Sequence, residues 1–211
     1  MLTKIAGKLK RDGLLKTLAF LRKKLVRIQR HEVYTAFCAG ADEPDWLPGE
    51  GACFSSCSDL WHQVVSEQLV SFSADNTDYL QAVARGEAEG LAVLCDGKVV
   101  HYAFLMRRNK MACLLGFGKK VGLLGNACTI DGYRGRGCHA RSVRARIKMA
   151  EQLGLHRVIS ETSHDNTASR HGLVKGGMKY FGTVAFVVLF NVLVVRYTRP
   201  HSSIKRVELC C

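Results

Sequence analysis

The stretch from Thr129 to Ala140 reads TIDGYRGRGCHA and connects a predicted strand to a predicted helix. Gly135 and Gly137 permit a turn in which main-chain N–H groups approach an anion closely. The helix that follows adds unpaired N–H groups and the positive end of its dipole. The stretch therefore predicts a site for a phosphate or pyrophosphate group, with a solvated basic helix end as the alternative.

Two widespread phosphate-binding patterns do not fit this stretch. It lacks the third glycine of G-x-G-x-x-G, and the chain has no Gly-Lys-Ser/Thr of a P-loop. The stretch instead resembles the cofactor-binding motif Arg/Gln-x-x-Gly-x-Gly/Ala of the GNAT acetyltransferase superfamily, which runs here from Arg134 to His139. His139 departs from the pattern, because the family usually has glycine or alanine there.

A second segment agrees with this resemblance. GNAT proteins often carry Asn-x-x-Ser/Ala on the short helix after the next strand, followed by Lys-x-Gly-Phe. This chain has Asn166-Thr167-Ala168-Ser169 and then Lys175-Gly176-Gly177-Met178, in which Met178 replaces phenylalanine as an apolar anchor. The resemblance covers roughly residues 90–197.

The residue pattern alone indicates a mixed α/β (α+β) domain. Strands at 91–94 and 98–106 flank Asp96-Gly97, a strong hairpin signal. Apolar residues at helical spacing predict a helix within 135–153, with Val143, Ile147, Ala150 and Leu153 on one face. The remaining predicted elements are strands at 110–115, 121–130, 157–162, 179–189 and 192–197, a short strand around 33–37, a short helix at 166–175, and helical or partly helical segments at 59–71 and 77–84.

The resemblance implies a central, mostly antiparallel sheet that is splayed between its fourth and fifth strands and flanked by helices. Those strands would be about 123–130 and 157–162, and acetyl-CoA or another acyl-CoA would lie in the split. The expected cofactor-binding residues are Cys128, Thr129, Ile130, Arg134, Gly135, Arg136, Gly137, Cys138, His139, Ala140, Asn166 and Ser169. Arg141 or Arg144 would meet the ribose phosphate, or lie on a solvated helix face.

Acyl transfer to an amine requires a neutral amine, a polarised thioester carbonyl and a stabilised leaving thiolate. Many relatives use a tyrosine seven residues after the motif asparagine as general acid, and here that position is Leu173. The candidate bases are Glu161, near the end of its strand, and His101, whose imidazole titrates in a useful range. A solvent-exposed glutamate and a buried, hydrogen-bonded histidine are the structural alternatives.

The net charge of +13 is concentrated in two segments. Residues 134–148 carry +6, and residues 1–30 carry ten basic residues and one acid. Residues 1–30 predict a cationic amphipathic helix, whose apolar stripe comprises Leu14, Leu18, Leu21, Leu25 and Ile28. This helix is expected to bind an anionic membrane surface, a protein partner or its own domain. Nucleic acid is disfavoured because Phe20 is the only aromatic residue among the basic residues of 1–30 and the sequence has no zinc-finger or RNA-binding motif.

The predicted organisation is an amphipathic helix at 1–30, a loop or linker at 31–60, an acyltransferase domain at 61–200 and a tail at 201–211. The chain lacks a signal-peptide pattern and has nine irregularly spaced cysteines, which predicts a cytoplasmic protein. The basic N-terminal segment adds the expectation of a peripheral position at the inner face of the membrane. Cys53 and Cys57 have no matching second pair, so no metal site is expected.

These features predict an acyl-CoA-dependent N-acyltransferase that acts on the primary amine of a small acceptor. The motif spacing and the segment Val99-Val100-His101-Tyr102 most resemble GNAT proteins that act on amino sugars in polysaccharide or lipid-linked glycan biosynthesis. The alternatives are an acetyltransferase of an amino acid or protein amine, and a membrane-surface or partner-docked interaction protein with this fold. A homodimer is also an expectation.

Overall fold

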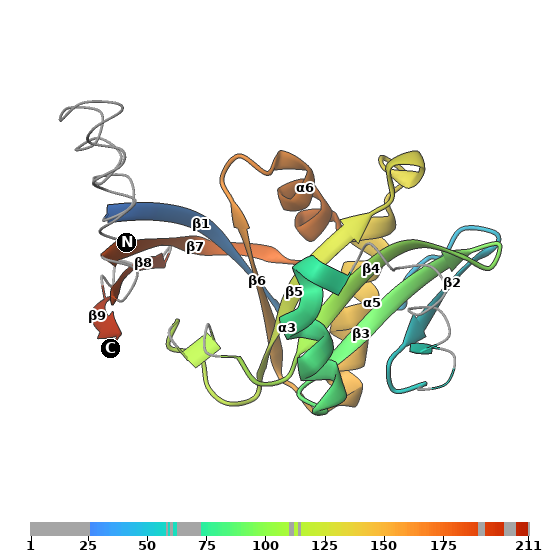
Figure 1. Ribbon diagram of the computed structural model, residues 1–211, viewed down its shortest axis with the longest axis horizontal. Coiled ribbons are helices and arrows are strands. Elements are labelled where there is room, and N and C mark those ends of the chain that lie inside the picture. The colour runs from blue at the N-terminus through green and yellow to red at the C-terminus, as the bar shows by residue number, and fades with distance from the viewer. Residues whose placement is uncertain are drawn as a thin grey trace, which may run out of the picture. The chain divides into compact units, whose positions relative to one another are not determined.

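The computed structural model describes residues 26–57, 59, 61–62, 73–109, 112–113, 115–189, 193–200 and 206–210 (Figure 1). The chain divides into two compact units. The larger unit is Glu32–Phe181, and the smaller unit combines Met1–His31 with Gly182–Cys211. The two sequence motifs both lie in the larger unit.

The larger unit is built on a sheet with the strand order β2-β3-β4-β5-β6-β1. Its strands are β1 (Val26–Phe37), whose residues from Glu32 onward belong to this unit, β2 (Glu50–Phe54), β3 (Ala88–Cys95), β4 (Lys98–Met106), β5 (Val121–Thr129) and β6 (Arg157–Ser163). Pairing is antiparallel from β2 to β5 and parallel between β5 and β6. Asp96 and Gly97 connect β3 to β4 with φ values of 49° and 76°, which is the left-handed turn expected of an Asp-Gly hairpin.

Helices cover both faces of this sheet (Figure 1). On one face, α3 (Ser73–Ala84) packs Tyr79, Leu80 and Val83 around Phe104. On the other face lie α5 (Cys138–Gln152) and α6 (Thr167–Lys175). The predicted apolar face of α5 is confirmed, because Val143, Ile147 and Ala150 are buried in the core.

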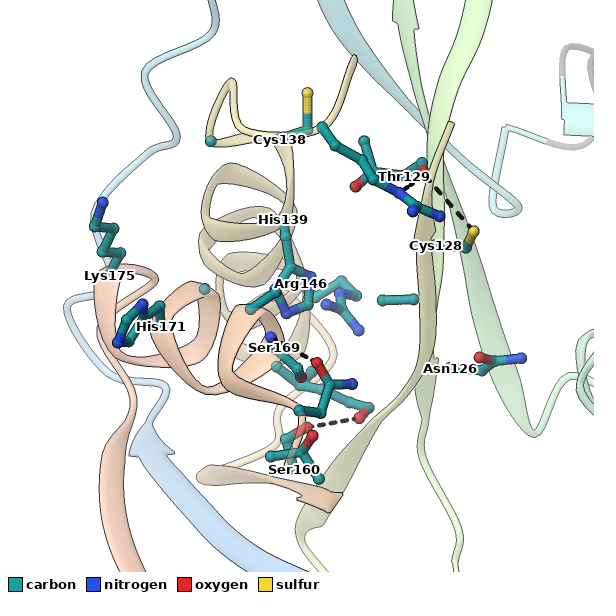
Figure 2. Close-up of a pocket in the computed structure, with 18 of the residues that line it drawn as sticks. Asn126, Cys128, Thr129, Cys138, His139, Arg146, Ser160, Ser169, His171 and Lys175 are labelled. Atoms are coloured by element: carbon teal, nitrogen blue, oxygen red, sulfur yellow. Dashed lines mark hydrogen bonds between the residues drawn. The ribbon is translucent and has the colours of Figure 1, made fainter. Parts of the chain in front are cut away.

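The sheet splits between β5 and β6. These strands pair only through Val121, Gly122 and Leu123 of β5. The Ser160 hydroxyl still donates to the Leu124 carbonyl oxygen at 3.1 Å, and beyond this point the strands separate (Figure 2). On its other edge, β5 carries a β-bulge between its pairings with Tyr102 and Phe104. The predicted mixed, splayed fold is confirmed.

In the smaller unit, three strands form an antiparallel meander. These are β7 (Lys179–Leu189), whose residues from Gly182 onward belong to this unit, β8 (Leu193–Pro200) and β9 (Arg206–Cys210). Two strands in this region were predicted, but β9 lies in the segment that was predicted to be a tail. Residues 190–192, which connect the two predicted strands, fall outside the described residues.

Two further segments differ from the sequence prediction. Residues 26–30, predicted as the end of a helix, belong to β1. Residues 31–60, predicted as a loop or linker apart from a short strand around 33–37, supply most of β1 and all of β2, so only that short strand is confirmed. The β-branched residues of this segment favour the strand. The Thr35 hydroxyl donates to the Val158 carbonyl oxygen in β6, and the Cys38 N–H donates to the His156 carbonyl oxygen beside β6. Residues 1–25 of the predicted helix lie outside the described residues.

The predicted strand at 110–115 is also wrong, because residues 112–113 are helical. The Asn109 side-chain oxygen accepts a hydrogen bond from the Ala112 N–H at 2.6 Å. An asparagine in this position caps a helical turn and competes with strand formation.

A buried ion pair joins β2 to α5. The Arg141 Nη2 lies 2.7 Å from the Glu50 Oε1, with side chains 10% and 3% exposed. Replacing Glu50 by alanine is expected to lower the free energy of unfolding by about 3 kcal/mol, because the Arg141 guanidinium would remain buried without its counter-charge. Urea denaturation measures the change. The control is Glu87→Ala in the exposed pair with Arg85, which should cost less than about 1 kcal/mol, and equal losses would contradict the interpretation.

Candidate functional site

A cavity of about 670 Å³ opens where β5 and β6 separate (Figure 2). Its walls come from β5, β6, the turn before α5, and the facing sides of α5 and α6. Its volume is in the range of small-molecule and cofactor sites. Glu161 is the only carboxylate among the described residues that line it, whereas Arg134, Arg146 and Lys175 supply cations. The cavity therefore favours an anionic ligand.

The turn before α5 forms one end of the cavity. Gly135 and Gly137 both have φ of 78°, a conformation that glycine adopts without strain, and Gly137 is the N-cap of α5. The first N–H groups of α5 have no acceptor within the helix, and no acidic residue lies in its first turn. Arg134 stands at this end, where it contacts Asp131 at 2.9 Å and is largely exposed. Such a turn can hold a phosphate group through main-chain donors and helix-end charge.

Most of the predicted cofactor-binding residues come together at this cavity. Those that line it are Cys128, Thr129, Arg134, Gly135, Gly137, Cys138, His139, Asn166 and Ser169. Three predicted residues do not line it. The Ile130 N–H donates to the Val100 carbonyl oxygen, Arg136 lies over the Tyr133 ring, and Ala140 is buried.

Neither arginine predicted for the ribose phosphate faces the cavity. Arg141 is held in the ion pair with Glu50, and Arg144 donates to the Lys175 carbonyl oxygen at 3.0 Å. Both side chains thus join parts of the protein to one another. The sequence could not distinguish them from cofactor ligands, because their partners lie far away in the chain.

The second motif positions α6 beside the cavity. The Asn166 side-chain oxygen accepts a hydrogen bond from the Ser169 N–H at 3.0 Å, which caps the helix (Figure 2). Both residues also line the cavity. The motif therefore fixes the start of α6 at the opening between β5 and β6.

His139, the departure from the family motif, occupies the space between α5 and α6. A Cβ atom on Gly172 would lie 2.1 Å from the His139 Cδ2, so the imidazole requires a glycine on the facing helix. Burial, with a further contribution from the Arg146 charge, lowers the pKa of His139 to about 4. The side chain is therefore neutral at physiological pH.

The low pKa of His139 predicts a loss of stability in acid. Unfolded histidine takes up a proton below about pH 6.5, whereas folded His139 does so only near pH 4. Acidification from pH 7.5 to pH 5 should therefore cost about 2 kcal/mol through this residue, and His139→Gln should remove that part of the loss. Denaturant unfolding of both proteins at the two pH values measures this, and comparison at pH 7.5 isolates the packing change. An equal acid loss in both proteins would contradict the assignment.

The two candidate bases occupy different places. Glu161 lines the cavity on β6, beyond the last residue of β6 that pairs with β5. His101 is fully buried outside the cavity lining, and its Nδ1 lies 2.8 Å from the Thr129 hydroxyl. Burial is the largest cause that lowers the pKa of His101 well below 6.5. Leu173, at the position of the usual general acid, is buried in the core.

Two side chains near the cavity were not predicted. Arg146 on α5 is 1% exposed and forms part of the inner cavity wall. Tyr79 on α3 packs against the β5 bulge and stacks on Phe104. Burial raises the pKa of Tyr79, a hydrogen bond from the Asn126 N–H opposes this, and Glu161 raises it further. A signal for Arg146 is its position seven residues after His139, on the same side of α5.

The described residues contain no group of His, Cys, Asp and Glu side chains that could hold a metal ion. Among the helices of the described part of the chain, none is long and apolar enough to cross a membrane.

No known family profile matches the sequence, and no curated protein matches it. Solved structures do match. The GCN5-related N-acetyltransferase of Sphaerobacter thermophilus aligns with a TM-score of 0.51 and 13% identity over 82% of this chain and 55% of that one. The GCN5-related N-acetyltransferase of Kribbella flavida aligns with a TM-score of 0.50 and 13% identity over 92% of this chain and 67% of that one.

A third structure is the GCN5-related glucosamine N-acetyltransferase region of a fungal multi-domain GH3 β-N-acetylglucosaminidase. It aligns with a TM-score of 0.52 and 14% identity over 82% of this chain and 22% of that one. The present chain thus spans from about a fifth to about two thirds of the length of these three proteins. The splayed sheet, the glycine turn before α5 and these alignments agree, and the chain has the fold of the GCN5-related N-acetyltransferase (GNAT) superfamily.

Proposed function

We propose that the protein is an N-acyltransferase that transfers an acetyl or other acyl group from acyl-CoA to a primary amine. The observation that carries this proposal is the cavity between β5 and β6, with the Gly135–Gly137 turn and the α5 N-terminus at one end. In this proposal, the main-chain N–H groups of the turn hold the CoA diphosphate, and the pantetheine arm extends along β5 toward the bulge. The activity is assigned to the larger unit, Glu32–Phe181, which contains the cavity.

Glu161 is the proposed general base. It is the only carboxylate among the described residues that line the cavity, and it lies on the splayed part of β6. A carboxylate there can accept the amine proton directly or through one water molecule. His101 is a weaker proposal for this role, since its imidazole lies outside the cavity lining.

An amino sugar is the proposed acceptor. The fungal structure that aligns with this chain is a glucosamine N-acetyltransferase region, which supports an amino-sugar amine as the first class to test. An amino acid or protein amine is the alternative. The experiment is a turnover screen in which acetyl-CoA and longer acyl-CoA substrates are tested with amino sugars, amino acids and polyamines. Turnover is measured as the release of free CoA thiol. We expect turnover with an amino sugar. If none of these amines gave thiol release, the result would contradict the proposal.

Residues 1–30 are proposed to hold the enzyme at an anionic membrane surface. Their ten basic residues against one acid support electrostatic attraction to anionic lipids. The test is co-sedimentation with anionic and neutral vesicles, comparing the wild type with a variant in which Arg22, Lys23, Lys24 and Arg27 are serine. A variant with serine at the exposed Lys119 and Lys120 is the control. Equal binding by all three proteins would reject the anchor, and binding to neither vesicle would favour a protein partner or a second copy.

A further inference from the structure

Arg146 is a buried cation that makes no ion pair with any described residue. Its Nε donates to the Ser142 carbonyl oxygen at 3.2 Å, and its Nη1 donates to the Phe104 and Gly125 carbonyl oxygens at 3.1 and 3.2 Å. The Nη2 group carries two further N–H donors, and it makes no hydrogen bond to a described residue. Burying a charge without a counter-charge costs several kcal/mol, so the position calls for an anion.

The groups around Arg146 leave its charge uncompensated. Burial lowers the pKa of Arg146 to about 9, so the guanidinium remains charged at neutral pH. His101 and His139 face it, and both are kept neutral by pKa values well below 6.5. The imidazole Nε2 atoms of both histidines are buried without a described partner. Arg141, whose charge also acts on His101, is already neutralised by Glu50.

The position of Arg146 along the cavity identifies the part of CoA that it would meet. Arg146 follows the Gly137 N-cap by nine residues, which is roughly 13 Å along a helix. Arg146 therefore lies deep in the cavity, away from the end that is proposed to hold the diphosphate. Its contact with the Gly125 carbonyl oxygen places it at the β5 bulge (Figure 2). In CoA, the sulfur lies at the end of the pantetheine arm that is farthest from the diphosphate. The depth of Arg146 in the cavity therefore corresponds to the expected depth of the sulfur.

We propose that Arg146 binds the sulfur of CoA and stabilises it as a thiolate when the acyl group leaves, an inference that rests on the proposed function. The acceptor amine attacks the thioester carbonyl, the C–N bond forms and the C–S bond breaks. The sulfur departs with the electron pair of the C–S bond, and the proton lost by the amine passes to Glu161. The positive charge of Arg146 meets the negative charge as it develops. The usual tyrosine acid is not required in this scheme, in agreement with leucine at position 173.

The test compares two ligands that differ in whether sulfur can ionise. The dissociation constants of CoA and S-methyl-CoA are measured by calorimetry on the full chain between pH 6 and pH 8.5. If Arg146 lowers the pKa of the bound thiol by one to two units from an ordinary thiol value of about 8.5, the affinity for CoA relative to S-methyl-CoA rises about five- to fortyfold over this range. This comparison needs no variant, so it stands even where a substitution fails to fold.

Variants then assign the effect to Arg146. In Arg146→Gln the relative gain with pH should disappear while S-methyl-CoA still binds, and Arg146→Lys should retain part of it. Arg144→Gln, on the same helix but directed at Asp45 and the Lys175 carbonyl, is the matched control and should keep the full gain.

Each outcome has one meaning. CoA binding with no relative gain in the wild type overturns the role of Arg146 and leaves the proposed function standing. A gain that persists in Arg146→Gln also overturns it, because another group then stabilises the thiolate. Failure of both ligands to bind the wild type overturns the proposed function, and the inference with it.

Discussion

Replacing Glu161 by glutamine is expected to lower the turnover number for acyl transfer about a hundredfold and to leave the affinity for acetyl-CoA unchanged. Glutamine keeps the size of the side chain at the cavity wall but cannot accept the amine proton. Because Glu161 lies on the splayed part of β6, the loss should appear in the chemical step rather than in cofactor binding. Initial rates at saturating acetyl-CoA and calorimetric titration measure the two quantities separately.

The control for Glu161 is Glu151→Gln on α5, where the carboxylate contacts Lys148 at 3.0 Å outside the cavity. This variant should retain wild-type turnover. The pH profile gives a second readout, because loss of a general base removes the fall in rate that protonation of that base causes at low pH. Unchanged turnover in Glu161→Gln would rule out Glu161 as the base and direct attention to a water molecule or to the acceptor itself.

Replacing Gly137 by aspartate is expected to raise the dissociation constant of acetyl-CoA about a hundredfold, or about 3 kcal/mol. The new carboxylate would lie at the N-cap of α5, where it would repel the diphosphate and occupy the donors that bind it. Calorimetry with acetyl-CoA measures the change. Gly137→Asn is the matched variant, because asparagine has a similar shape and tolerates positive φ but carries no charge.

The comparison of aspartate with asparagine separates charge from backbone strain at position 137. A further control is Gly132→Asp, which adds the same charge at a position where a Cβ atom meets nothing within 4 Å. We expect Gly137→Asn to lose affinity by less than Gly137→Asp, and Gly132→Asp to bind almost as the wild type does. Equal losses in the aspartate and asparagine variants would show that the turn acts through its shape alone.

The parts of this fold that depend on local chemistry were predictable from the sequence. The Asp96-Gly97 turn needs two left-handed residues in succession, and the structure has them. The glycine turn before α5 and the Asn166 cap of α6 likewise follow from what a few adjacent residues can adopt. The mixed, splayed sheet was predicted from the family resemblance of these two motifs.

The parts that depend on distant partners were not predictable in the same way. Residues 26–30 continue an apolar spacing that also suits a helix, and pairing within the sheet decides in favour of β1. Arg141 resembles a cofactor ligand in the sequence, but Glu50, which is 91 residues away, neutralises it. Arg146 is one of several basic residues on α5, and only the fold places it against the bulge of β5.

The most direct test of the acyl-CoA site is amide hydrogen exchange of the full chain with and without saturating acetyl-CoA, read by mass spectrometry. The account predicts that acetyl-CoA slows exchange in two segments, residues 124–129 of β5 and residues 135–140 at the start of α5, with a smaller effect at the start of α6. The sheet edge at β2 should exchange at the same rate in both samples. Unchanged exchange in the first two segments at saturating acetyl-CoA would contradict the central claim that this cavity binds acyl-CoA.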